Sequence, residues 1–229
     1  MNLDTIRHVA DTSGGILYLM AVLLLVALTI ALERAWYLRR VLGIGNGVIS
    51  QLDAVTRAEA PLLQKLGESC GQLPHARLLN AASKHDLDHD FDRLADKMDE
   101  AIMREAPQVD RYLWILDTIV TLAPLLGLLG TIIGMFNAFQ VLSDPGSAPT
   151  KVTGGVAEAL LATACGLFIA ILGLVFFNGL NNRVRVIMHQ MDTLKIMLIN
   201  RMYPHYHARS DSHARGHESG PRVVRVGEA

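Results

Sequence analysis

The stretch that decides the fold is Val152-Thr-Gly-Gly-Val-Ala-Glu158-Ala-Leu-Leu-Ala-Thr163-Ala-Cys-Gly-Leu-Phe-Ile-Ala-Ile-Leu-Gly-Leu-Val-Phe-Phe177. It is long enough to cross a bilayer, because a membrane-spanning helix needs about 20 mostly apolar residues. Its only ionisable side chain, apart from the weakly acidic thiol of Cys165, is the carboxyl of Glu158. A charge at membrane depth costs roughly 2.5–3.5 kcal/mol on insertion scales. Glu158 is therefore a candidate functional residue.

Two further apolar blocks lie upstream of this stretch, so the sequence predicts three membrane-spanning helices. We place the spans at 15–38, 113–142 and 152–180. The first is followed by Trp36 and several arginines, a pattern typical of an anchor at the membrane surface. Its apolar run exceeds the roughly 7–15 residues of a signal-peptide core, so an uncleaved anchor is expected. The predicted fold class is an all-α membrane protein whose three spans extend into the cytoplasm as long helices.

The distribution of positive charge predicts the orientation. The N-terminal tail and the connection between the second and third spans each carry one Arg or Lys, whereas the segment 33–111 carries eleven and the region after the third span carries eight. Arg and Lys near span ends mark the cytoplasmic side. We therefore expect a multi-pass membrane protein with its N-terminus outside, which in a bacterial inner membrane is the periplasm, and its C-terminus in the cytoplasm.

The parts outside the spans are predicted to be mostly helical. They comprise a periplasmic segment 1–14, a cytoplasmic helical domain 39–112, a periplasmic hairpin 143–151, a cytoplasmic helix 181–203 and a flexible His-rich tail 204–229. Leu94, Met98 and Ile102 recur at helical spacing in the cytoplasmic domain. We expect a break around Gly43–Gly47 after the first long helix, and a kink at Pro107 before the second span.

The helix after the third span carries a second apolar stripe that includes Met191, Leu194 and Leu198. It predicts that this helix continues to about Met202, just before Pro204. The histidines of the tail hold no fixed spacing to Cys or Glu partners, so we predict no metal site and no cofactor. The two cysteines of the chain do not predict a disulfide framework.

Small residues dominate one side of the second and third spans. Small seams let helices approach closely in lipid, where van der Waals contact drives association. We predict that the following glycines pack helices together: Gly127, Gly130, Gly134, Gly166 and Gly173.

Polar side chains within the same spans form a candidate proton pathway. Neither span contains a Lys, Arg or His to pair with Glu158, and burial favours the neutral form of a carboxyl. A carboxyl that alternates between neutral and charged forms is suited to proton relay. We name Glu158, Thr131 and Thr163 as the pathway, with Asp117 and Thr121 as possible accessories. For each threonine, a hydrogen bond to its own helix backbone is the structural alternative, and for Glu158 it is a structural hydrogen bond made in the protonated form.

Two motifs resemble the signature spans of the MotA/TolQ/ExbB proton-channel family, and the resemblance is closest to its ExbB branch. They are Leu122-Ala-Pro-Leu-Leu-Gly-Leu-Leu-Gly-Thr131-Ile-Ile-Gly-Met135 and Gly154-Gly-Val-Ala-Glu158-Ala-Leu-Leu-Ala-Thr163-Ala-Cys-Gly-Leu167. The resemblance implies a homo-oligomeric helical bundle, usually a pentamer, around a pore. It also implies single-span ExbD-like helices in that pore, each with one aspartate, and a TonB-like partner. The implied function couples proton-motive force to TonB-dependent outer-membrane uptake of iron chelates, haem or cobalamin.

Other functions are kept as alternatives. A TolQ-like role in the Tol-Pal envelope-maintenance motor would use the same membrane chemistry. A non-conducting membrane scaffold would use Glu158 only for hydrogen bonding. We do not predict an enzyme, because no His lies in a span and no second intramembrane carboxylate has a catalytic spacing to Glu158. A nucleic-acid partner is not predicted either.

Overall fold

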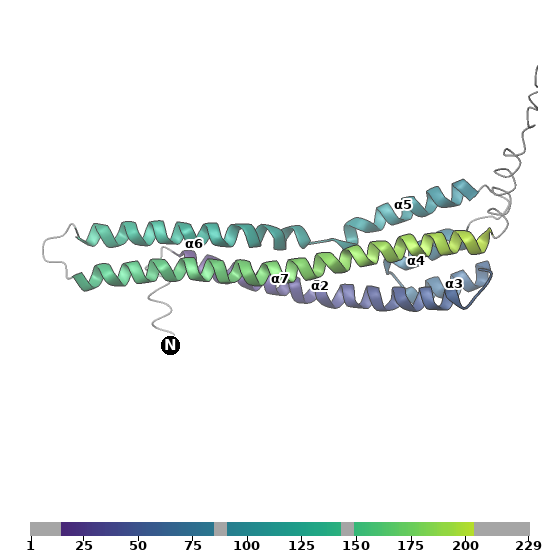
Figure 1. The fold of residues 1–229 in the computed structure, drawn as a ribbon, viewed down its shortest axis with the longest axis horizontal. Coiled ribbons are helices and arrows are strands. Elements are labelled where there is room, and N and C mark those ends of the chain that lie inside the picture. The colour runs from purple at the N-terminus through teal and green to yellow at the C-terminus, as the bar shows by residue number, and fades with distance from the viewer. Residues whose placement is uncertain (1–14, 85–90, 143–148, 204–229) are drawn as a thin grey trace, which may run out of the picture. The chain divides into compact units, whose positions relative to one another are not determined.

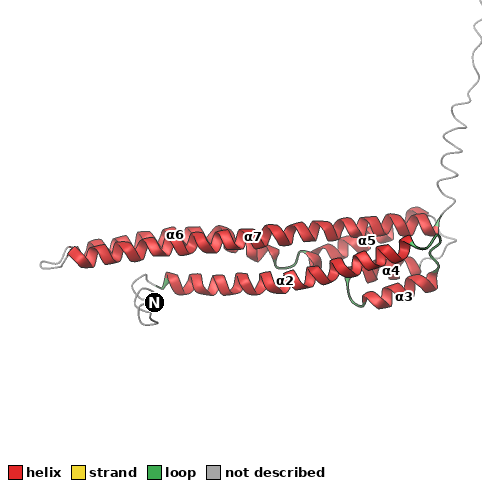
Figure 2. Cartoon of the chain, turned by 60° about the horizontal axis from the view of Figure 1, so that its bottom comes forward, coloured by secondary structure: helices red, strands yellow, loops and turns green. Residues whose placement is uncertain are grey.

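The computed structural model describes residues 15–84, 91–142 and 149–203, and every regular element in these ranges is an α-helix (Figures 1 and 2). The elements, in chain order, are α2 (Ile16–Asp53), α3 (Ala60–Cys70), α4 (Pro74–Ser83), α5 (Phe91–Val109), α6 (Leu113–Leu142) and α7 (Pro149–Met202). The predicted all-α fold is confirmed. The N-terminal segment 1–14 and the His-rich tail 204–229 lie outside the described residues.

Three helices are long and apolar enough to cross a membrane: α2, α6 over Leu113–Gln140, and α7 over Thr153–Met202. Only 22%, 28% and 22% of their most apolar windows are buried in the single chain. Large apolar side chains such as Leu25, Phe136 and Phe168 are exposed. A water-soluble protein rarely leaves such surfaces uncovered, so these faces suit lipid or neighbouring helices.

The chain divides into two units, Met1–Leu42 with Pro107–Ile187, and Gly43–Ala106 with Met188–Ala229. The first unit holds the apolar parts of α2, α6 and α7. In the second unit, α3 and α4 contact each other. Buried apolar side chains form the interior of the second unit. They come from both predicted stripes (Leu94, Met98 and Ile102; Met191, Leu194 and Leu198) and from α3 and α4 (Leu63, Leu78 and Leu79).

The predicted break at Gly43–Gly47 is wrong, because α2 continues without interruption to Asp53. A glycine inside a helix costs about 1 kcal/mol relative to alanine. Burial of Val48 and Leu52 on the same helix outweighs that cost. Gly45 itself is required by packing, since a Cβ there would lie 2.6 Å from His75 Nε2. The glycines therefore serve close approach in this helix rather than its termination.

The helix that contains Pro107 does not end at this proline but shortly after it. Pro107 lies inside α5, which ends two residues later at Val109, and α6 begins at Leu113. Tyr112, in the intervening turn, has φ 67°, a left-handed conformation that non-glycine residues rarely adopt. At the other boundary, α7 begins at Pro149, so the last three residues of the predicted hairpin are helical. Proline is favoured in the first turn of a helix because its missing N–H has no partner there in any case.

Candidate functional site in the membrane-spanning helices

Helices α6 and α7 pack through a seam of glycine and alanine. A Cβ added at Gly166 would lie 2.5 Å from the carbonyl oxygen of Ala123, and one at Gly134 would lie 2.7 Å from the Ala159 Cβ. The same clash arises at the other glycines predicted to pack helices: Gly127 against the Thr163 Cα at 3.0 Å, Gly130 against the Ala162 Cβ at 2.8 Å, and Gly173 against the Val120 Cγ2 at 2.8 Å. Backbones that approach this closely leave no room for a third helix between α6 and α7.

Thr163 uses this close approach to bond across the seam. Its hydroxyl donates a hydrogen bond to the Gly127 carbonyl oxygen at 2.9 Å. The alternative of a bond to its own helix is therefore wrong for Thr163. Thr131 and Thr121 do bond to their own helix. Thr131 donates to the Leu128 carbonyl at 2.6 Å, and Thr121 donates to the Thr118 carbonyl at 2.9 Å. Each hydroxyl oxygen retains acceptor capacity for water or a partner carboxyl.

The seam also sets the heights of the three pathway residues. Gly134 lies opposite Ala159, the neighbour of Glu158, and Gly127 lies opposite Thr163. With a rise of about 1.5 Å per residue, Glu158 and Thr163 are separated by about 7.5 Å along α7, and Thr131 lies at a height between them. All three residues are half-buried. The structure thus places Glu158, Thr131 and Thr163 within about 7.5 Å of one another in height along the α6–α7 pair, and we call this stretch the polar layer.

The two accessory candidates lie elsewhere. Asp117 and Thr121 are exposed near the start of α6. At about 1.5 Å per residue they lie roughly 21 Å and 15 Å along the helix from Thr131. The structure does not bring them to the layer of Glu158. Asp117 lies one turn inside the start of the span at Leu113, and Thr121 lies one turn further in.

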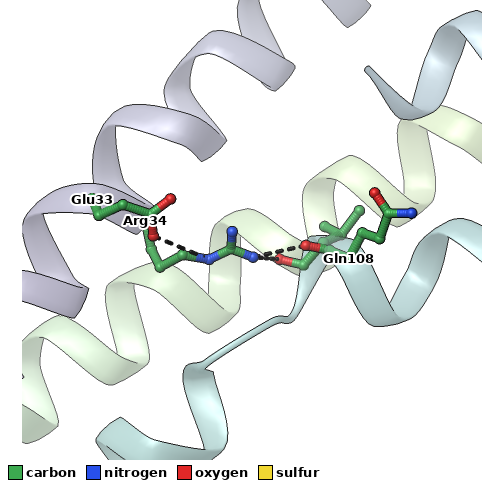
Figure 3. Close-up of polar contacts among 4 residues, drawn as sticks. Glu33, Arg34 and Gln108 are labelled. Carbon is green, nitrogen blue, oxygen red and sulfur yellow. Dashed lines mark hydrogen bonds and ion pairs between the residues drawn. The ribbon is translucent and has the colours of Figure 1, made fainter. Parts of the chain in front are cut away.

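Arg34 is the main polar residue whose role the sequence did not reveal. Its side chain is 4% exposed, and its guanidinium donates hydrogen bonds to the carbonyls of Gln108 at 2.8 Å and Val109 at 2.9 Å (Figure 3). These are the last carbonyls of α5, which lack partners within the helix. The guanidinium also lies 4.8 Å from the centre of the Tyr37 ring. A buried cation at a helix C-terminus is favourable for both hydrogen bonding and the helix dipole.

A signal for this role was present in the sequence. Arg34 lies three residues after Ala31 and four before Leu38, both of which are buried. These spacings put Arg34 on the buried stripe of the helix, which predicts a guanidinium that faces inward. The arginines that follow the first span, Arg34 among them, had indicated only the membrane surface and the cytoplasmic side.

The comparison with known proteins decides the family. Residues 71–193 match the family model described as the MotA/TolQ/ExbB proton channel family. The chain belongs to this family. The matched range contains the complete α6–α7 seam together with all three pathway residues, whereas Arg34 lies outside it.

Several members of the family are similar to this chain. An ExbB-like biopolymer transport protein of Synechocystis is 33% identical over 159 residues, which cover 67% of this chain and 74% of the relative. An ExbB homologue of Methanothermobacter thermautotrophicus is 27% identical over 84% of this chain and 69% of its own length. The Tol-Pal system protein TolQ of Haemophilus influenzae is 40% identical over 91 residues, or 39% of this chain and 40% of the relative. Membership of this family and the three apolar helices together support a location in the inner membrane.

The second unit of this family member contains a buried ion pair. Glu105 is fully buried on α5, and one of its carboxylate oxygens lies 2.7 Å from the Arg77 guanidinium of α4. Burial raises the pKa of the Glu105 carboxyl, and the nearby Arg77 opposes that shift. Burial therefore exceeds the compensation that Arg77 provides.

The same unit also buries a neutral histidine. His75 is fully buried on α4, and burial lowers its pKa to about 4. Its Nε2 atom and the Gln190 Oε1 atom both crowd the Gly45 position, while the Gln190 amide donates to Asn46 at 2.6 Å. Within the described parts of the chain, no group of three His, Cys, Asp or Glu side chains is placed to hold a metal ion.

Proposed function

We propose that the protein is the ExbB-like proton-channel subunit of an inner-membrane TonB–ExbB–ExbD motor, with a function in biopolymer and protein transport. In this function, proton-motive force drives TonB-dependent outer-membrane uptake of iron chelates, haem or cobalamin. The observation that carries the proposal is the half-buried carboxyl of Glu158 within an apolar span, in one layer with Thr131 and Thr163. It is not an enzymatic role, and it requires no cofactor.

The α6–α7 seam constrains how such a channel is built. The contact at Gly166 is too close to admit even a methyl group, so it excludes a partner helix from the space between α6 and α7 of one chain. We therefore place the pore between copies, at the height of the three polar residues. We propose a homo-oligomer, most simply a homopentamer, with ExbD-like single-span helices in the pore. The exposed apolar side chains of the spans then contact neighbouring copies or lipid.

The proposed proton path needs two carboxyls. Glu158 accepts a proton when charged and donates one when neutral, and a carboxylate of the ExbD-like helix supplies the second station. The Thr163 hydroxyl is held in place by its bond to Gly127 and offers its lone pairs to water or to the partner. One charge that crosses 100 mV releases about 2.3 kcal/mol, so a demanding mechanical cycle requires several protons.

A growth experiment tests the role of Glu158. A host that lacks its own exbB is supplied with this chain and its ExbD-like partner, and growth is measured on a scarce iron chelate. We expect Glu158→Gln and Glu158→Ala to abolish growth while the protein still reaches the membrane. If either variant supports growth at the wild-type rate, the relay is wrong, and the non-conducting scaffold becomes the better explanation.

A TolQ-like role is the second candidate, because TolQ proteins of two organisms also match this chain. Those matches cover 39% and 43% of the chain, whereas the ExbB-like matches described above cover 67% and 84%. The longer ExbB-like matches are the reason for placing that role first, although proteins named ExbB of Aquifex aeolicus and Xanthomonas campestris match only 34% and 41% of the chain. Complementation separates the two: rescue of detergent sensitivity in a tolQ-deficient host, without rescue of iron uptake in an exbB-deficient host, identifies the TolQ-like role.

The proposed orientation places the N-terminus in the periplasm and the C-terminus and the second unit in the cytoplasm. Its support is the excess of Arg and Lys in segments 33–111 and 181–229. Single cysteines introduced at exposed positions and labelled with a membrane-impermeant thiol reagent test it. Labelling of the second unit from the outside of intact cells would contradict it.

A further inference from the structure

A pocket of about 500 Å³ lies in the first unit, at the turn between α5 and α6. Its lining includes Asp110, Arg111 and Tyr112 of the turn, Trp114 and Asp117 at the start of α6, and Asn181 of α7. Neither the proton path nor the seam uses this cavity, since Asp117 is about 21 Å along the helix from Thr131.

The two walls of the pocket indicate that it lies at the level of the lipid headgroups. One wall is the start of α6, where the polar turn gives way to the apolar span at Leu113. The facing wall is α7 between Phe177 and Asn181, where the third span ends and polar residues begin. Both walls therefore mark the same boundary of the membrane. Trp114, which is 69% exposed, is of the residue type that favours this boundary.

The turn that carries the charged groups is held in one conformation. Arg34 bonds to the carbonyls of Gln108 and Val109, directly before the turn. The Arg111 guanidinium lies 4.5 Å from the centre of the Tyr112 ring, a contact that favours a position of the cation at the pocket wall. A preorganised cation costs less to order when a ligand binds.

The charges of the pocket select one kind of headgroup. It offers one cation, Arg111, and two carboxylates, Asp110 and Asp117. Arg111 suits a phosphate, which guanidinium groups bind through two parallel hydrogen bonds. The carboxylates suit a primary ammonium group, which donates three hydrogen bonds. The pair of carboxylates disfavours an anionic headgroup, and a choline headgroup has no N–H to donate. We propose that this pocket binds the headgroup of a phospholipid with a primary amine, phosphatidylethanolamine.

Lipid retention in the full-length protein tests this site. The protein is equilibrated with equal amounts of phosphatidylethanolamine, phosphatidylcholine and phosphatidylglycerol, and the lipids that stay bound are counted by native mass spectrometry. We expect phosphatidylethanolamine to be retained about tenfold over the other two, the effect of one or two charge-assisted hydrogen bonds. Arg111→Gln should lower the retention of all three lipids, because each carries the phosphate that the guanidinium binds. The double variant Asp110→Asn/Asp117→Asn should remove the preference for phosphatidylethanolamine. Arg39→Gln, an exposed arginine of the first unit that does not line the pocket, should leave it unchanged.

Four results would overturn the proposal. Equal retention of the choline lipid would show that the amine is not recognised. Unchanged selectivity in the Asp110→Asn/Asp117→Asn variant, or unchanged lipid retention in Arg111→Gln, would place the lipid elsewhere. Efficient disulfide crosslinking between copies through Trp114→Cys would show that a neighbouring chain covers the pocket. Soluble phosphoethanolamine serves as the competitor that separates headgroup recognition from acyl-chain binding: if it displaces none of the bound lipid, headgroup recognition is excluded.

Discussion

Gly166→Ala places a methyl carbon 2.5 Å from the Ala123 carbonyl oxygen and 3.1 Å from the Gly127 Cα. Both neighbours are backbone atoms, so no side chain can rotate away. Ordinary van der Waals contact begins near 3.4 Å, so α6 and α7 must separate locally by about 0.9 Å. Forcing an extra methyl group into a tight contact costs about 1–3 kcal/mol. The separation also stretches the bond of Thr163 to the Gly127 carbonyl, which is 2.9 Å in the wild type.

The assay for this prediction is unfolding in detergent micelles, followed by fluorescence and compared with a matched control. Gly179→Ala lies in the same helix, and nothing lies within 4 Å of its Cβ position. Both variants gain the same helix propensity of up to about 1 kcal/mol. We expect Gly166→Ala to be less stable than Gly179→Ala by about 1–3 kcal/mol. Equal stability of the two variants would refute the seam as a backbone-to-backbone contact.

Three further predictions concern buried ionisable side chains. Arg34→Gln should lower the unfolding free energy by about 2–4 kcal/mol, because two carbonyls at the end of α5 lose a charged donor, and Arg39→Gln should have almost no effect in the same unfolding assay. Glu105→Gln should raise the melting temperature at pH 7.5, because it removes a buried charge. Arg77→Gln should lower the melting temperature, because it leaves the Glu105 carboxylate without its cation. Equal shifts in one direction would contradict this account of the ion pair. The pKa of His75 is about 4 in the folded protein and about 6.5 when unfolded, so the unfolded state takes up the proton first and stability is lost as pH falls from about 6.5 to 4. The loss should reach about 3 kcal/mol relative to a His75→Gln variant in pH-dependent unfolding, and parallel curves would contradict it.

The membrane part of the fold was predictable because few structures satisfy its constraints. A single apolar stretch such as 152–180 must form a helix in lipid, because every backbone N–H and C=O there needs a hydrogen-bond partner within the protein. The small residues at 127, 130 and 166 likewise indicated a close helix pair, since small side chains are the main means of approach between apolar helices. The structure adds which glycine meets which backbone atom.

The remaining features depend on tertiary contacts that local patterns do not encode. Gly43–Gly47 has the composition of a helix break, yet α2 continues because its buried face packs on both sides of Gly45. A threonine inside a span usually donates a hydrogen bond to its own helix, yet the Thr163 hydroxyl donates to the Gly127 carbonyl on another helix. Arg34 resembles an interfacial charge, yet it caps the end of a helix 74 residues further along the chain. In each case a partner distant in sequence determines the outcome.

The central claim is that the carboxyl of Glu158 carries protons, and the most direct test is proton flux. The protein is reconstituted in liposomes with its ExbD-like partner, a potassium gradient with valinomycin sets the membrane potential, and an internal pH dye reports entry. We expect a flux that Glu158→Gln abolishes and Thr163→Val lowers, whereas Thr29→Val, whose hydroxyl bonds to its own helix in the first span, leaves it unchanged. Wild-type flux in the Glu158→Gln variant, at equal protein incorporation, would contradict the claim.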